Sequence, residues 1–224
     1  MSLYGNPEGC VNITDEYFSV NHLPSCKMYI DSARHINFGG RSIYCEIGAG
    51  LGRQIEVIAG INPKMTVLLF EIPPQLYVAN QYLKKVFGER VIEYDDGIKL
   101  SPGNLQDIEG KIVILPTWKI PDWAETKIDI FWNSASFQEM EPDVVENYLS
   151  YVKSMNPEWI YINAVPWGKS WGEWKPGMGG SKLTVTEEVY FNALLSRYLL
   201  QTKYPTHYFL SKRKYQSYIF RRQG

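Results

Sequence analysis

Three glycines at alternate positions, Gly48, Gly50 and Gly52, constrain this chain more than any other feature of its sequence. An apolar run that ends in Glu46 precedes them, and residues 54–58 read as a short helix. Glycine permits positive φ angles and lets a ligand approach the main chain closely. The helix that follows presents unpaired N–H groups to the same space. The stretch therefore predicts a strand, a nucleotide-binding loop and a helix.

The residues around the loop indicate which nucleotide it binds. The dinucleotide fingerprint GxGxxG requires a glycine where this sequence has Arg53. The carboxylate of Glu46, two residues before the first glycine, would repel a pyrophosphate and attract a cation. S-adenosylmethionine (SAM) carries a sulfonium and an ammonium group but no phosphate. The loop therefore favours SAM, and the alternative is an ordinary strand-to-helix turn.

A second acidic residue ends the next apolar run. Residues 66–70 have the composition of a buried strand, and Glu71 follows them. In α/β nucleotide-binding folds, a carboxylate about 20 residues beyond the glycine loop binds the ribose hydroxyls. Glu46 and Glu71 therefore predict one adenosine-containing ligand between two successive strand ends.

The composition narrows the class of protein. A chain of 224 residues with 45% hydrophobic residues is long enough for one sizeable core. We expect a single domain over 41–224, with an N-terminal helical segment over 1–40 that covers the cofactor as a lid. The net charge of −1 argues against a nucleic-acid partner. Three cysteines without metal spacing favour a reducing cytoplasm, and no signal peptide or membrane span is expected.

The remaining apolar runs predict a mostly parallel sheet. Residues 128–132 and 159–163 have the composition of its fourth and fifth strands. The third strand has two candidates, because spacing favours 91–94 whereas unbroken hydrophobicity favours 112–115. Two strands after residue 205 predict a terminal hairpin.

Three motifs together resemble a bacterial family of sugar O-methyltransferases among the class I SAM-dependent methyltransferases. They are the ExGxGxG loop over 46–52, the acid and proline over 71–73, and the NxxSFQEM stretch over 133–140. The likeness spans 41–165, and it departs from the family where Glu-Ile-Pro replaces Asp-Leu-Pro at 71–73. It implies an α/β Rossmann-like sandwich, with a mostly parallel seven-stranded sheet that ends in a C-terminal antiparallel hairpin.

The resemblance also implies roles for residues along the cofactor. It assigns Glu46 to the methionine end, through its ammonium group or a nearby water, and Glu71 to the ribose. An acid after the third strand faces the adenine amine, which implicates Asp96 or its neighbour Asp95; a polar turn is the alternative. The implied cofactor-binding set further includes loop and strand-end residues, namely Gly48, Ala49, Gly50, Gly52, Arg53, Asn133 and Ser134.

Methyl transfer to a sugar hydroxyl benefits from a general base, by a factor of about 10²–10⁴. We predict Glu139 as that base and Gln138 as the residue that orients the acceptor, because the segment after the fourth strand faces the acceptor in this fold. Glu139 has an alternative role, as an acid that complements a helix dipole. The fourth and fifth strands end in Asn133 and Asn163, without carboxylates, so no metal is predicted.

An aromatic and glycine-rich stretch over 165–180 follows the fifth strand. We expect a loop this rich in glycine to leave some of Trp167, Trp171 and Trp174 outside the core. Because indole faces stack on the C–H faces of sugars, these residues predict a sugar or glycan acceptor. The alternatives are a hydrophobic plug or a contact in an oligomer, since exposed tryptophans also mark protein interfaces.

Two other functions fit parts of the sequence. An NAD-linked oxidoreductase would use Glu71 for its ribose, but Arg53, Glu46 and the lack of a hydride-partner site argue against it. A non-catalytic module would keep the fold and use the tryptophan loop to bind a protein or glycan partner.

Overall fold

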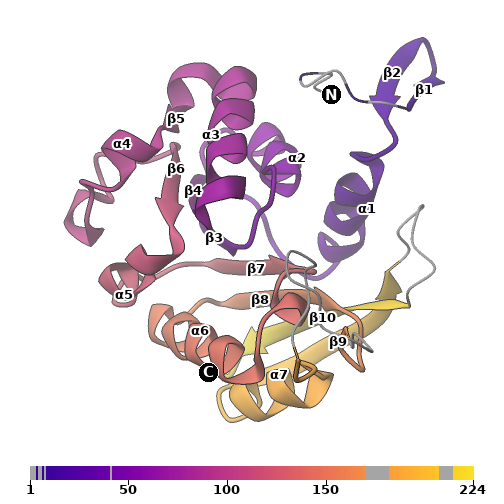
Figure 1. Cartoon of the computed structure of the whole chain (residues 1–224), viewed down its shortest axis with the longest axis vertical. Helices are drawn as coiled ribbons and strands as arrows, with labels where there is room; N and C mark the ends of the chain where they lie inside the picture. Colours follow the sequence, from indigo (N-terminus) through magenta and orange to yellow (C-terminus); the bar gives the residue numbers. More distant parts are fainter. Residues whose placement is uncertain (1–3, 5–6, 8, 41, 170–181, 207–213) are drawn as a thin grey trace.

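The computed structural model describes residues 1–224 except 1–3, 5–6, 8, 41, 170–181 and 207–213. Within the described residues, the central sheet has eight strands in the order β5-β6-β4-β3-β7-β8-β10-β9 (Figure 1). Its strands are β3 (Ile43–Ile47), β4 (Thr66–Glu71), β5 (Val91–Ile92), β6 (Ile112–Pro116), β7 (Ile130–Ser134), β8 (Trp159–Ala164), β9 (Tyr198–Thr206) and β10 (Tyr215–Arg222). All neighbouring pairs from β5 to β8 are parallel, whereas β10 is antiparallel to both β8 and β9.

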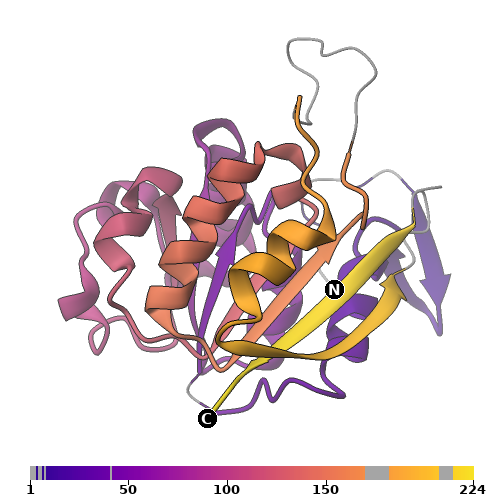
Figure 2. The same ribbon diagram turned by 90° about the horizontal axis from the view of Figure 1, so that it is seen from below.

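Helices cover both faces of this sheet, as Figures 1 and 2 show together. One face carries α1 (Leu23–Ser32), α2 (Arg53–Ile61) and α3 (Pro73–Phe87), and the other carries α5 (Ile120–Trp123), α6 (Pro142–Met155) and α7 (Glu187–Leu194). The shorter elements are β1 (Cys10–Ile13), β2 (Glu16–Ser19), α4 (Tyr94–Gly97), η1 (Gly88–Arg90), η2 (Pro102–Asn104), η3 (Thr117–Lys119) and η4 (Phe137–Glu139). Of the described helices, none combines the length and the apolar character that crossing a bilayer requires.

The central strands are hydrophobic throughout because both of their faces are covered. Every residue of β4, β6 and β8 is buried. Alternate residues of each strand enter different cores: Leu68 and Phe131 belong to the core on the α6 side, and Val67 and Trp132 belong to the core on the α1 side. The sheet is therefore a rigid platform whose carboxyl edge presents the loops after β3, β4 and β7.

The structure confirms the predicted mostly parallel sheet with its C-terminal antiparallel hairpin, and it decides the third strand. Residues 112–116 pair with Val67–Glu71 of β4 and are all buried, which places them inside the sheet. Residues 91–92 form only a two-residue strand at the sheet edge, outside β6. Both candidates are therefore strands, and the described sheet has eight strands where the sequence predicted seven.

Candidate functional site

The three glycines of the loop serve different purposes, although all have positive φ angles of +75°, +57° and +83° in chain order. A Cβ atom at Gly48 would lie 2.1 Å from Ser136 Oγ, and one at Gly52 would lie 2.8 Å from a methyl carbon of Leu83. Beside Gly50, no heavy atom of the described chain comes within 4 Å of the Cβ position. Packing therefore requires the outer glycines, and Gly50 is where a ligand can lie against the main chain.

We expect Gly48→Ala to destabilise the fold by about 1–3 kcal/mol through backbone strain alone, with a further cost from displacing Ser136. Gly60, near the end of α2, is the matched control because the space at its Cβ position is open. Gly60→Ala should instead stabilise the protein by about 0.5–1 kcal/mol, since alanine favours a helix. Urea unfolding gives both free energies. Equal changes in the two variants would contradict the strained turn.

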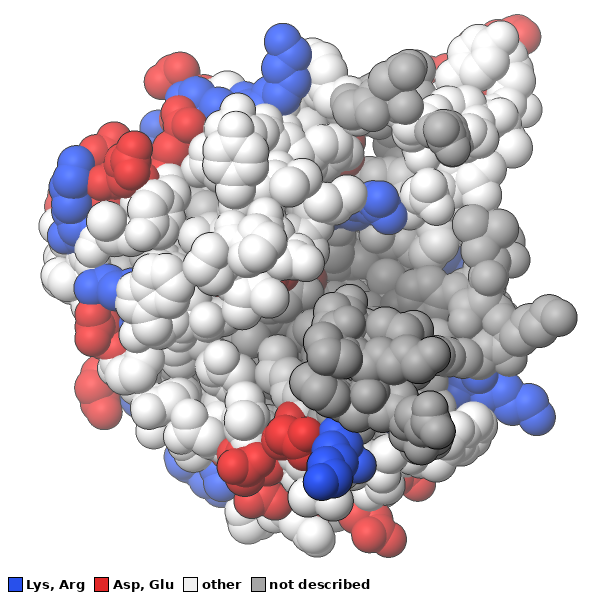
Figure 3. All heavy atoms as spheres, in the orientation of Figure 1, with Lys and Arg blue, Asp and Glu red and all other residues white. Residues whose placement is uncertain are grey.

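Two cavities meet over this loop. The first, of about 490 Å³, lies between the loop and α1, and its lining includes Glu46, Arg53 and Met28. The second, of about 640 Å³, extends toward the ends of β4 and β6. Four residues line both cavities, namely Gly48, Gly50, Ser134 and Ala135. Figure 3 shows the molecule hollowed on this face. The two cavities together form one cleft at the carboxyl edge of the sheet, which is where ligands bind in open α/β folds.

Glu71 is fixed at this cleft by the main chain. The N–H of Gly50 donates to its Oε2 at 2.6 Å, and the N–H of Ile72 donates to its Oε1 at 2.8 Å. Burial raises the pKa of the Glu71 carboxyl, and the two N–H donors oppose that rise. Since each carboxylate oxygen can accept a further hydrogen bond, Glu71 is placed to receive two hydroxyl donors from a ligand in the second cavity.

Glu46 is almost fully buried beside the first cavity, at 2% exposure. The hydroxyl of Tyr44 donates to its Oε2 at 2.7 Å. Burial raises the pKa of Glu46 to about 8; the charge of Glu71 adds to this rise, whereas the Tyr44 hydrogen bond opposes it. A cation bound in the cavity would favour the ionised form. Glu46 is therefore an acid whose charge state depends on a cationic ligand.

We expect Glu46 to make the ligand-free protein less stable as pH rises. Its pKa is about 8 in the folded chain, against an ordinary value of 4.5. Between these values the folded chain holds a proton that the unfolded chain has lost, so the free energy of unfolding falls with pH, by up to about 1.4 kcal/mol per unit. Glu46→Gln should remove this contribution. Urea unfolding at several pH values tests it, and equal slopes in both proteins would contradict it.

Gln54 is a site residue that the motif did not predict. It lies in the first turn of α2, lines the first cavity and is 5% exposed. Neither its amide oxygen nor its amide nitrogen has a hydrogen-bond partner among the described residues. A buried polar group without a partner costs about 1–3 kcal/mol, so this amide is available to a ligand. The sequence signal was a polar residue directly before residues 55–59, which are apolar except for Glu56.

Several predicted cofactor residues lie at the cleft. Arg53, Ala49 and Ser134 line the first cavity together with Gly48 and Gly50, whereas Gly52 lines neither cavity. Asn133 does not line either cavity: it is fully buried, and its Nδ2 donates to the carbonyl of Ile47 at 2.8 Å and to Ser136 Oγ at 2.6 Å. Its predicted contact with the cofactor is therefore corrected to a structural role, in which it joins the ends of β3 and β7.

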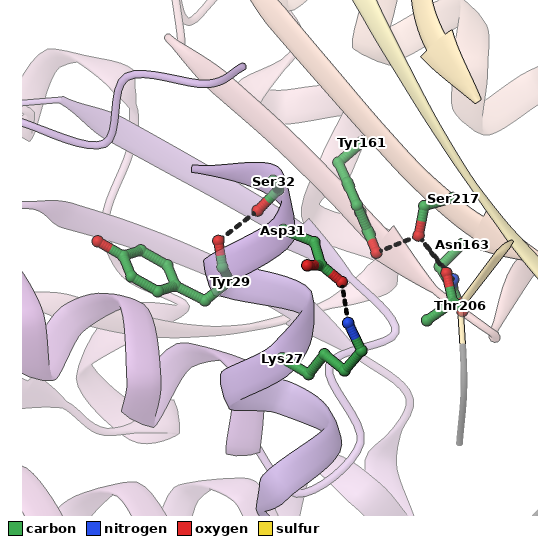
Figure 4. A network of polar contacts seen from close by, with 8 residues as sticks. All are labelled: Lys27, Tyr29, Asp31, Ser32, Tyr161, Asn163, Thr206 and Ser217. Carbon is green, nitrogen blue, oxygen red and sulfur yellow. Dashed lines mark hydrogen bonds and ion pairs between the residues drawn. The ribbon is translucent and has the colours of Figure 1, made fainter. Parts of the chain in front are cut away.

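The end of β8 is likewise occupied by protein contacts. Asn163 is fully buried, and its Nδ2 donates to Thr206 Oγ1 at 2.7 Å and to Ser217 Oγ at 3.0 Å. Ser217 also lies 2.7 Å from the hydroxyl of Tyr161 (Figure 4). This network links β8, β9 and β10 on the face that α1 covers. Within the described chain, no group of three or more histidine, cysteine or acidic residues could hold a metal ion.

Asp96 lies away from the cleft. Its side chain is 76% exposed and forms an ion pair with Lys99 at 2.8 Å. The reason is the strand order, because Asp96 follows β5 at the sheet edge, whereas the strand beside β4 is β6. The residue that follows β6 is Thr117, and it lines the second cavity. This geometry does not support the predicted adenine contact of Asp96, and the strand-end residue at the cleft is Thr117.

The two predicted catalytic residues have different surroundings. Gln138 is 1% exposed; its Nε2 donates to the Tyr215 hydroxyl at 3.1 Å, and its Oε1 accepts the N–H of Val165 at 2.8 Å. This burial does not fit the predicted role of orienting an acceptor. Glu139 lines the second cavity, is 42% exposed and forms an ion pair with Lys169. Of the pair, only Glu139 can reach a ligand in the cleft.

The predicted acceptor loop is described only in part. Trp167 is 58% exposed, while Trp171 and Trp174 lie outside the described residues. Trp167 is not among the residues that line the two cavities. The predicted contact between these tryptophans and the acceptor therefore stays a prediction.

No family model and no curated protein matches this chain. Solved structures resemble its fold. Magnesium protoporphyrin IX methyltransferase from Synechocystis PCC 6803, with S-adenosylhomocysteine (SAH) bound, is 12% identical, with a TM-score of 0.61 over 91% of this chain and 84% of its own. The 1,6-didemethyltoxoflavin N1-methyltransferase of Burkholderia thailandensis is 14% identical, with a TM-score of 0.55 over 92% and 79%.

Mitomycin 7-O-methyltransferase is similar too, at 15% identity and a TM-score of 0.55 over 92% of this chain and 55% of its own. At these identities the likeness concerns the fold. The chain therefore has the fold of the class I SAM-dependent methyltransferases, as its motifs predicted.

Proposed function

We propose that this protein is a SAM-dependent O-methyltransferase that acts on a hydroxyl of a sugar or glycan precursor. The observation that carries the proposal is the placement of two buried carboxylates, Glu46 and Glu71, in one cleft beside the open face of Gly50. A pyrophosphate would meet two acids here, whereas a sulfonium, an ammonium and a ribose are all favoured. The likeness to methyltransferases solved with SAM or SAH bound supports the same cofactor.

The donor and acceptor groups of the cleft fit the parts of this cofactor. Glu71 accepts hydrogen bonds from the ribose hydroxyls, and Glu46 accepts from the ammonium group or balances its charge. The unpartnered amide of Gln54 donates to the carboxylate at the methionine end. Ile72 and Met140 give the second cavity apolar surface for the adenine. The ammonium, carboxylate and ribose groups of the cofactor thereby each have a partner of suitable chemistry.

The bound cofactor supplies a methyl group activated by a positively charged sulfur. The chain holds the acceptor against it, since orientation alone is worth about 7–11 kcal/mol in well-arranged systems. Glu139 accepts the proton of the acceptor hydroxyl. Lys169 pairs with that carboxylate and is itself largely buried, at 11% exposure, so it fixes the direction of the base. The sugar acceptor is supported by the resemblance over 133–140 and by the exposed indole of Trp167.

Calorimetric titration of the full chain with SAM, SAH and NAD tests the cofactor. We expect SAM and SAH to bind and NAD to give no heat of binding. Binding of NAD alone would replace the methyltransferase with an oxidoreductase. Absence of all three bindings would favour a module that keeps the fold without the activity.

A further inference from the structure

Exposed aromatic side chains lie beside the cleft on α3 and η3. Trp118 of η3 is 57% exposed, and Tyr77 of α3 is 68% exposed. A cavity of about 430 Å³ has both among its lining residues, together with Tyr94. Another cavity, of about 480 Å³, is lined by Trp118 and by Tyr148 and other residues of α6. Because Trp118 lines both, we call these adjoining hollows the Trp118 grooves.

The Trp118 grooves are continuous with the cleft. Thr117, Val144 and Tyr148 line the groove on the α6 side, and the same three residues line the second cavity of the cleft. The reason is topological, since η3 begins directly after β6, whose carboxyl end lies at the cleft edge. A ligand whose end occupies the cleft can therefore extend along the grooves.

The polar groups of the grooves are acids and amides. Glu93, Asp95 and Gln81 border the groove on the α3 side, and Asp143 and Asn147 border the other. Among the described residues that line the two grooves, none is lysine, arginine or histidine. Figure 3 shows the same character, with few charged atoms over the area between α3, α5 and α6 and more of them toward the rim.

This charge pattern decides between kinds of ligand. Glu93 pairs with Lys84 at 3.3 Å, but the described lining itself contributes carboxylates and no cation. It therefore repels phosphates and does not fit a nucleic acid or an anionic lipid surface. Exposed indole and phenol rings that gather along one groove favour an apolar partner, and the acids and amides beside them can accept hydrogen bonds from it. A sugar ring offers both, because its C–H face is apolar and its rim carries hydroxyls.

We propose that the Trp118 grooves bind a neutral or amino-sugar oligosaccharide, with one ring packed against the indole of Trp118. The direction of the oligosaccharide, with its terminal hydroxyl in the cleft, rests on the proposed function. The binding of the saccharide does not, because the grooves are separate from Glu46, Gln54 and Glu71.

Calorimetry with cellohexaose, maltohexaose, chitohexaose and an anionic galacturonic acid hexamer tests the grooves on the full chain. We expect at least one of the first three to bind and the anionic hexamer not to bind. Trp118→Ala should weaken the binding at least tenfold, and Trp118→Tyr should restore most of it. Tyr17→Ala is the matched control, because Tyr17 on β2 is 59% exposed and belongs to neither groove.

The inference is overturned if none of the first three hexamers binds, if the anionic hexamer binds best, or if Trp118→Ala binds as tightly as the wild type. Titration with SAH in parallel separates the two proposals. SAH binding without saccharide binding would contradict the saccharide site in the grooves and leave the methyltransferase proposal intact. Saccharide binding that depends on Trp118, without SAH binding, would support the saccharide site and contradict the methyltransferase proposal.

Discussion

Glu71→Ala should weaken the binding of SAH by about 10²–10⁴-fold. Two hydrogen bonds from ribose hydroxyls to a carboxylate are each worth about 1.5–3 kcal/mol, and every 1.4 kcal/mol is a factor of about ten in affinity. The alanine also leaves the N–H of Gly50 without the acceptor that it has at 2.6 Å. Calorimetric titration measures the loss directly. An affinity within twofold of the wild type would remove Glu71 from the cofactor site.

Two controls separate the ribose contact from the support that Glu71 gives to the loop. Asp96→Ala removes an exposed carboxylate outside the cleft and should leave SAH affinity unchanged. The wild type should bind adenosine more tightly than 2′,3′-dideoxyadenosine, which lacks the ribose hydroxyls. Glu71→Ala should bind both equally if the hydroxyls are its partners. A preference for adenosine that persists in the variant would assign the effect to loop support.

The sequence predicted the position of both acids because a single physical rule places them. Strands buried on both faces are unbroken apolar runs, so their ends are visible in the sequence. A polar residue at such an end lies at the carboxyl edge of a parallel sheet. Glu46 and Glu71 follow this rule, and the glycines between them indicate the turn after the first strand. The fold and the cofactor side of the cleft were therefore predictable from local pattern.

The orientation of the side chains around the end of β7 was harder to predict from the sequence. Ala135 has a φ angle of +67°, which is unusual for a residue other than glycine. On either side of this turn, Asn133 and Gln138 are buried, while Ser134 and Glu139 lie at the cleft. Nothing in the composition of 133–140 signals such a turn, so the segment was predicted correctly as a neighbour of the cleft while two of its side chains were misassigned.

Asp96 and Gln54 show two further limits. The prediction for Asp96 depended on strand order, which is set by pairing between segments distant in sequence and not by the hydrophobicity of either segment. Gln54 was missed because a polar residue in the first turn of a helix is usually solvated. Its lack of a partner becomes visible only when α1, α2 and the loop enclose it.

Glu139→Gln should lower kcat by about 10²-fold or more, the lower end of what a general base contributes. Glutamine keeps the shape of the side chain but cannot accept a proton at neutral pH. Because the shape is kept, SAH affinity should stay unchanged. Transfer of labelled methyl groups from SAM to an oligosaccharide that binds the protein measures the rate. Glu146→Gln on α6 is the matched control, since Glu146 is exposed and lines neither cavity of the cleft.

The ion pair with Lys169 makes the base hypothesis sharper. If Lys169 only positions the carboxylate, Lys169→Met should lower the rate less than Glu139→Gln, and the double variant should be no slower than Glu139→Gln alone, because the two residues act through one proton transfer. An acid that merely complements a helix terminus would instead change stability and leave the rate intact. An unaltered kcat in Glu139→Gln would therefore assign Glu139 to the fold, and acceleration would rest on orientation alone.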